Sequence, residues 1–111
     1  MRIEECCYSP HISLDKTEQI NALAASFKIL ADPIRLKILY LIRNKEICVC
    51  HITSALKLSQ SKVSYHLKIL TEAGLIKRRT QWCWSYYSLS EDFDKWFLEN
   101  TSLLTLLNGE E

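Results

Sequence analysis

The sequence predicts a small, mainly α-helical domain that carries one β-hairpin. Its 111 residues include only two glycines and two prolines, so residues that interrupt helices are rare. Apolar residues recur at helical spacing along most of the chain. One stretch, residues 75–89, is instead rich in β-branched and aromatic residues on both sides of a short connection, which is typical of a hairpin.

The N-terminal part predicts an arm followed by two helices. Residues 1–14 form a short arm without a clear apolar period. Apolar residues between positions 20 and 30 recur every three or four positions, which indicates a first helix. Asp32 and Pro33 then supply an N-cap and a first-turn proline for a second helix.

Two shorter helices are expected next, over residues 48–56 and 59–73. Ser59 is suited to cap the start of the second of these helices, and Gly74 is suited to close its end. Two helices joined by so short a turn are a helix-turn-helix candidate. In the hairpin that follows, Trp84 and Tyr86 alternate along one strand and are expected to face the core.

A last helix is expected from Ser90 and gives the chain an apolar stripe. We therefore assign residues 15–108 to one domain. A domain this short leaves much of its surface exposed, and oligomerisation is a common way to hide such a stripe. The residues of the stripe are Phe93, Trp96, Phe97, Leu103, Leu104 and Leu107.

Composition excludes several classes of protein. No apolar run approaches the roughly 18 residues needed to cross a bilayer. The acidic N-terminus lacks the apolar stretch of a secretory signal. These features predict a cytoplasmic protein without a membrane partner. No Ser/His/Asp or Cys/His arrangement and no glycine-rich phosphate loop stands out, so an enzyme is not predicted.

Charge and helical periodicity together predict a DNA-reading surface. Residues 57–79 carry six cations against Glu72 alone, which fits a phosphate-binding surface but also an ordinary solvated face. In the helix over 59–73, small hydroxyls, an amide, a phenol and lysines lie opposite the apolar side, and such groups can approach base edges and phosphates. The DNA contacts expected in this way are Gln60, Ser61, Lys62, Ser64, Tyr65, Lys68, Arg78 and Arg79.

Five cysteines indicate thiolate chemistry, because their odd number and a reducing compartment argue against a disulfide framework. Cys48 and Cys50 stand at a helix start, where non-helical backbone lets them converge and the first amides favour thiolates. Cys6 and Cys7 lie in an arm that spans about 40 Å when extended, enough to reach this site. Three or four thiolates suit thiophilic ions and disfavour magnesium, calcium or manganese. Buried cysteine serving only as a small hydrophobe is the alternative.

Several runs resemble the ArsR/SmtB family of metal-sensing repressors. They are CVCHI at 48–52, LSQSKVSYHLKIL at 58–70, EAGLI at 72–76 and LADPIRLKIL at 30–39, and the resemblance covers roughly residues 20–90. It implies a winged helix-turn-helix homodimer, with the first and last helices at the interface, that represses an operator until an inducer binds. His66, within the second run, joins the expected DNA contacts.

The same resemblance implies what the cysteines bind. CVC at this position is the thiolate signature of arsenite/antimonite sensors and of cadmium/lead sensors, and an N-terminal cysteine arm completes the site in several of them. The implied metal ligands are therefore Cys6, Cys7, Cys48 and Cys50. The adjacent pair in the arm favours arsenite or antimonite over cadmium or lead. A zinc sensor, a thiol-redox regulator and a metal-buffering adaptor protein are the alternatives.

The chain departs from the family pattern at three places. Tyr65 stands where the family usually has histidine, which puts base preference in doubt. Lys57 replaces a usual turn glycine, at a modest local cost. The hairpin tip, residues 81–83, lacks the usual glycine, so its turn type is open.

Overall fold

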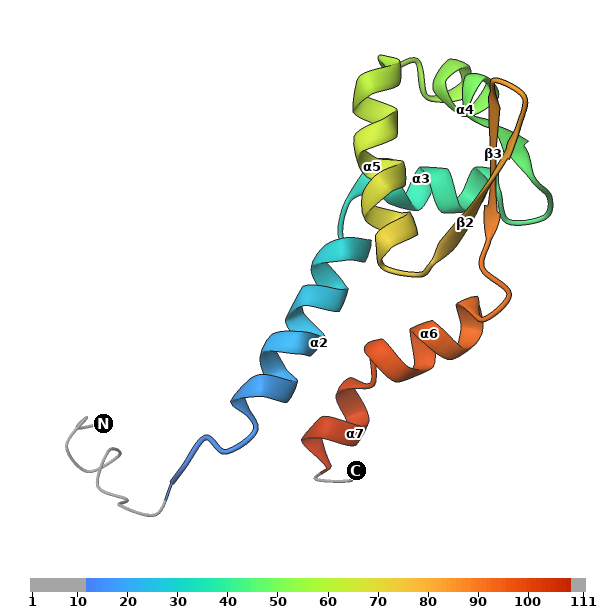
Figure 1. The fold of residues 1–111 in the computed structure, drawn as a ribbon. Coiled ribbons are helices and arrows are strands. Elements are labelled where there is room, and N and C mark those ends of the chain that lie inside the picture. The colour runs from blue at the N-terminus through green and yellow to red at the C-terminus, as the bar shows by residue number, and fades with distance from the viewer. Residues whose placement is uncertain (1–11, 109–111) are drawn as a thin grey trace.

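The structure is a computed structural model that describes residues 12–108 (Figure 1). Its elements, in chain order, are α2 (Thr17–Leu30), α3 (Pro33–Leu41), β1 (Ile47–Cys48), α4 (Val49–Leu56), α5 (Gln60–Glu72), β2 (Ile76–Gln81), β3 (Trp84–Leu89), α6 (Phe93–Asn100) and α7 (Leu103–Leu107). This order confirms the mainly α-helical fold with one hairpin. Among the described helices, none is long and apolar enough to cross a membrane.

Two polar side chains start helices as predicted. Asp32 accepts hydrogen bonds from the backbone N–H groups of Ile34 (2.8 Å) and Arg35 (3.3 Å), and this caps α3. Ser59 accepts one from the backbone N–H of Lys62 (3.2 Å) and caps α5. Each bond satisfies an amide that has no partner within its helix. The two caps therefore fix where α3 and α5 begin.

Among residues 12–108, three have positive φ, and each lies where the chain reverses. Gly74 (φ 86°) closes α5 in a Schellman motif, with Leu75 N–H bonded to the Leu70 carbonyl at 3.1 Å. Lys57 (φ 57°) takes the left-handed conformation at the end of α4, as expected where glycine is usual. Trp82 (φ 60°) is the first residue of the two-residue hairpin turn. A positive φ at the first turn residue alone is typical of a type II′ turn. Its side chain is 91% exposed.

The hairpin belongs to a three-stranded antiparallel sheet with strand order β1-β3-β2. β1 was not predicted, because two residues are too few to show a strand period. Its Cys48 pairs with Tyr86 of β3, which in turn pairs with Arg79 of β2. These three residues therefore form one row across the sheet.

The hydrophobic core lies between α3, α4, α5 and the sheet. On β3, the side facing this core is the one that carries Tyr87 and Leu89. The expectation for Trp84 and Tyr86 was wrong, because Trp84 is half-exposed and Tyr86 lies under the Arg79 guanidinium. In the described part of the chain, the large side chains that are fully buried are Ile38, Ile42, Ile52, Val63, Leu67, Leu70 and Leu75.

The single last helix expected after the hairpin is two helices, α6 and α7. Thr101 and Ser102 interrupt it, and the Ser102 hydroxyl donates to Thr105 Oγ1 at 2.7 Å. Both helices contact α2, which extends away from the rest of the domain (Figure 1). Large apolar side chains on these three helices remain exposed. They are Ile20, Phe27, Phe97, Leu98, Leu103, Leu104 and Leu107.

Candidate functional site

The outer side of α5 presents the polar residues expected to read DNA. The opposite side of α5 is anchored by Val63, Leu67 and Leu70, all fully buried. This burial fixes which side of the helix faces outward. The exposed residues are Gln60, Ser61, Lys62, Ser64, Tyr65 and Lys68.

His66 was expected to contact DNA, but it is buried inside the domain. Its Nδ1 accepts a hydrogen bond from Arg35 Nε at 3.1 Å. The same arginine donates to the carbonyls of Lys28 and Ile29 at the end of α2. His66 therefore links α5 to α3 and α2. Helical periodicity carried this signal, because His66 lies three residues after buried Val63.

A groove of about 450 Å³ separates α5 from the hairpin. Its polar lining fits a phosphate backbone that runs beside the reading helix. Arg78 donates to the Ser85 hydroxyl from Nε (3.2 Å) and Nη2 (3.0 Å), which holds its guanidinium at the groove. Val49, between the two cysteines of the CVC run, also lines it. The other lining residues are Gln60, Ser64, Lys68, Thr71, Tyr87 and one carboxylate, that of Glu72.

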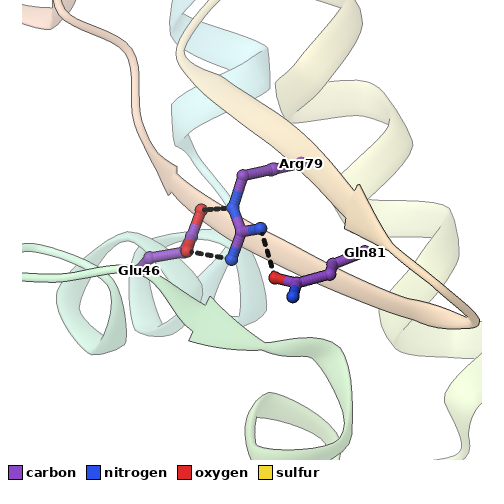
Figure 2. A network of polar contacts seen from close by, with 3 residues as sticks. All are labelled: Glu46, Arg79 and Gln81. Atoms are coloured by element: carbon purple, nitrogen blue, oxygen red, sulfur yellow. Dashed lines mark hydrogen bonds and ion pairs between the residues drawn. The ribbon is translucent and has the colours of Figure 1, made fainter.

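Arg79, the second hairpin arginine expected to contact DNA, is engaged within the chain (Figure 2). Its guanidinium donates to both carboxylate oxygens of Glu46, at 2.8 and 2.9 Å, and to Gln81 Oε1 at 2.8 Å. The hydrogen-bonded Arg79 guanidinium holds the pKa of Glu46 below its ordinary value. No local sequence pattern indicates this pair, whose members are 33 positions apart.

The thiols of Cys48 and Cys50 meet at the start of α4, with their Sγ atoms 2.9 Å apart. Cys48 occupies the N-cap position in an extended conformation (φ −67°, ψ 141°). Residues two apart on a regular helix point in nearly opposite directions, so this non-helical backbone is what lets the sulfurs converge. Cys48 is buried and Cys50 is exposed, so the pair can be approached from one side.

The two thiols differ in acidity because they share a hydrogen bond. That bond lowers the pKa of Cys48, and the backbone N–H groups of Cys50 and His51 lower it further, against the opposing effect of burial. The same bond raises the pKa of Cys50. The pair therefore holds one proton more tightly than the other.

Further metal ligands are not gathered around this pair within the described part of the chain. Among residues 12–108, no group of three or more His, Cys, Asp or Glu side chains could hold a metal ion. Cys83 lies exposed at the hairpin turn. Cys6 and Cys7 lie outside the described residues. Residues 12–108 thus supply two soft ligands, and thiophilic ions prefer such ligands.

The consecutive helices α4 and α5, the exposed polar side of α5 and the hairpin beside it define a winged helix-turn-helix DNA-binding protein. Residues 32–78 match the family described as "Bacterial regulatory protein, arsR family". The chain is 45% identical over 78 residues to the arsenical resistance operon repressor of Bacillus subtilis (strain 168), spanning 69% of this chain and 74% of that one. The chain belongs to the ArsR family, whose members are transcriptional regulators and not enzymes.

Two further similarities bear on ligand and assembly. A cadmium resistance transcriptional regulatory protein CadC homolog of Staphylococcus aureus is 34% identical over 82 residues, or 73% of this chain and 68% of that one. The homodimeric winged helix-turn-helix DNA-binding domain of a possible ArsR-family regulator from Mycobacterium bovis superposes with a TM-score of 0.63 at 26% identity. That comparison covers 91% of each chain.

Proposed function

We propose that this ArsR-family repressor binds operator DNA as a homodimer and is released when arsenite or antimonite binds its cysteines. The observation that carries the proposal is the meeting of the Cys48 and Cys50 thiols at the start of α4. α4 is the first helix of the helix-turn-helix and packs against α5. A ligand on these sulfurs therefore acts on the element that positions the reading helix.

For DNA binding, we propose that α5 enters the major groove while the hairpin follows the adjacent backbone. The exposed side of α5 offers donors and acceptors for base edges, and Arg78 lines the groove beside it. His66 leaves the proposed contact set because it is buried. Arg79 is also removed from the proposed contacts, because its guanidinium is hydrogen-bonded to Glu46. The proposed contacts are Gln60, Ser61, Lys62, Ser64, Tyr65, Lys68 and Arg78.

The homodimer is proposed from the exposed apolar surface of α2, α6 and α7. Contiguous apolar surface on so small a domain marks an interaction site. Phe27 on α2 and Phe97 on α6 are both partly exposed, although α2 contacts α6. The similar domain from Mycobacterium bovis, described as homodimeric, supports the same arrangement here.

For the inducer, we propose that Cys6 or Cys7 supplies the remaining thiolate. Trivalent arsenic is satisfied by three thiolates in a pyramid, which Cys48, Cys50 and one arm cysteine provide. The Bacillus subtilis relative, named for arsenical resistance, supports this choice. Cadmium or lead, which would accept all four sulfurs, is the second candidate, favoured by the Staphylococcus aureus relative.

The short separation of the two sulfurs favours a redox regulator as a further candidate. A thiolate of this pair is the reactive form toward a peroxide, which would oxidise the two thiols to a disulfide and be reduced to water. Such a protein would release DNA in metal-free buffer upon addition of peroxide. This response separates the redox candidate from the metalloid sensor.

The experiment titrates the protein with an operator duplex, first selected by the protein from random-sequence DNA, with and without arsenite. We expect arsenite to weaken operator affinity by at least tenfold, within the range of allosteric coupling. Cys48→Ser and Cys50→Ser should abolish this response, whereas the matched control Cys83→Ser should keep it. Ultraviolet thiolate absorption of Cys6→Ser and Cys7→Ser reports whether the arm contributes a ligand.

Unchanged operator affinity of the wild type in saturating arsenite would contradict the proposed induction and leave DNA binding intact. A cadmium response without an arsenite response would select the second ion. A variant lacking both Cys48 and Cys50 that still releases DNA on arsenite addition would show that the inducer binds elsewhere.

A further inference from the structure

The Arg79 guanidinium donates three hydrogen bonds, two to Glu46 and one to Gln81 (Figure 2). Its Nε donates to Glu46 Oε2 at 2.9 Å, its Nη2 to Glu46 Oε1 at 2.8 Å, and its Nη1 to Gln81 Oε1 at 2.8 Å. It also lies over the Tyr86 ring, 4.7 Å from the ring centroid. Two parallel bonds from a planar fork fix the orientation of both partners.

This pair joins the thiol segment to the hairpin. Glu46 directly precedes β1, whose second residue is Cys48. β1 pairs only with β3, so the sheet has no direct ladder between β1 and β2. The Glu46–Arg79 ion pair makes the link that the ladder lacks, because Arg79 lies on β2. Arg79 belongs to the same cross-strand row as Cys48 and Tyr86.

The two sulfurs of the thiol segment must move apart when they bind one ion. Metal–sulfur bonds of about 2.3 Å hold two sulfurs on one ion roughly 3.5 Å apart or more. The Cys48 and Cys50 sulfurs are 2.9 Å apart and must therefore separate. Cys48 is buried and paired within the sheet, so its displacement moves β1 and the residue that precedes it.

We infer that the Glu46–Arg79 ion pair transmits ligand binding at Cys48 and Cys50 to β2, and thereby alters the hairpin that lies against DNA. The inference rests on the proposed function and names how that site is regulated. Both residues are positioning residues, because neither contacts the ion or the operator. The pair is half-exposed, and exposed ion pairs add little to stability, so its geometric role is the larger one.

The experiment compares Glu46→Gln with the matched control Glu91→Gln. Glu91 forms an ion pair with Lys77 at 2.7 Å. Lys77 lies on β2, as Arg79 does, but Glu91 does not adjoin the cysteines. For each variant, operator affinity is measured with and without arsenite, and arsenite binding is measured separately by thiolate absorption without DNA. We expect Glu46→Gln to bind arsenite within about twofold of wild type but to lose roughly fivefold of the arsenite effect on operator affinity. Glu91→Gln should keep the full effect.

A second test exchanges the two charges. Glu46→Arg combined with Arg79→Glu should recover most of the arsenite effect that either single substitution removes. A purely local loss of stability would not be repaired in this way. If Glu46→Gln or the exchanged pair fails to fold, Arg79→Gln provides the same comparison.

The salt dependence of operator binding separates this role from direct DNA contact. If Arg79 bound a phosphate, Arg79→Gln would reduce the slope of log affinity against log salt by about one. We expect the slope to stay unchanged, and a reduced slope would overturn the inference. Full retention of the arsenite effect by Glu46→Gln would also overturn it. A wild-type protein that does not respond to arsenite would instead contradict the proposed function.

Discussion

The two parts of this chain differ in how much of their apolar surface they bury. The part from α3 to β3 encloses a core whose central side chains, such as Ile38 and Leu67, are fully buried. The part formed by α2, α6 and α7 has no fully buried large side chain among the described residues and leaves Leu104 74% exposed. The first part thus buries its apolar side chains within one chain, whereas the second leaves large apolar side chains exposed.

This difference separates what each part needs for stability. The α3–β3 part is held by contacts within one chain, because its helices and sheet pack on a common core. The helices α2, α6 and α7 contact one another but keep a large apolar surface outward. If the proposed homodimer forms, it covers this surface, and the stability of these helices then depends on protein concentration. Three substitutions test this difference between the two parts.

The largest effect is expected in the α3–β3 core. Leu67→Ala leaves a cavity among α3, α4 and α5, and large-to-small changes of this kind cost about 2–5 kcal/mol of unfolding free energy. Denaturant unfolding followed by circular dichroism measures this loss. The matched control is Leu98→Ala on exposed α6, which should cost far less. Equal losses for the two variants would show that the two parts are not packed differently.

A smaller effect is expected on the interface. Leu104→Asp places a charge on the exposed apolar side of α7 and should raise the dimer dissociation constant by at least tenfold. Sedimentation velocity over a range of concentrations measures this change. The control is Leu36→Asp on α3, where the side chain is 51% exposed but belongs to the other part. Loss of the dimer in the control variant alone would place the interface elsewhere.

The smallest effect is expected at the Asp32 cap, where the two parts join. Burial of the Asp32 carboxylate raises its pKa, but hydrogen bonds from the Arg35 and Ile34 amides outweigh this, so the pKa is lowered overall. A lowered folded-state pKa gives stability above the unfolded value of about 3.9, which is lost as pH falls through the folded value. Asp32→Ala should cost about 1 kcal/mol at pH 7.

The pH dependence provides the check on that cap. The difference in unfolding free energy between wild type and Asp32→Ala should shrink as the pH falls below about 4. Urea unfolding at a series of pH values measures it. A difference that stays constant to the lowest pH at which both proteins fold would show that the carboxylate charge contributes nothing.

The features that could be predicted from the sequence depend on residues that lie close together in the chain. Ser59 and Gly74 mark the ends of α5 because capping depends on groups within a few positions. The convergence of Cys48 and Cys50 followed in the same way from the non-helical backbone at a helix start. The buried side of α5 was equally clear from its period.

Features that depend on contacts between residues far apart in the chain could not be predicted from the sequence. β1 exists because Ile47 and Cys48 meet β3, about forty positions later, and not because of its own period. Glu46 and Arg79 are 33 positions apart, and nothing near either one in the chain indicates the other. The arginine looked available for phosphate because charge alone does not reveal a partner. Only the folded arrangement identifies it as an internal link.

The hairpin turn gives this chain a built-in optical probe. Trp82 is almost fully exposed at the turn, whereas Trp96 packs against the core beside Gly74. Iodide in solution should therefore quench the emission of Trp82 most, that of half-exposed Trp84 less and that of Trp96 least. Shielding of Trp82 from iodide would report when the hairpin tip is covered, without any attached label.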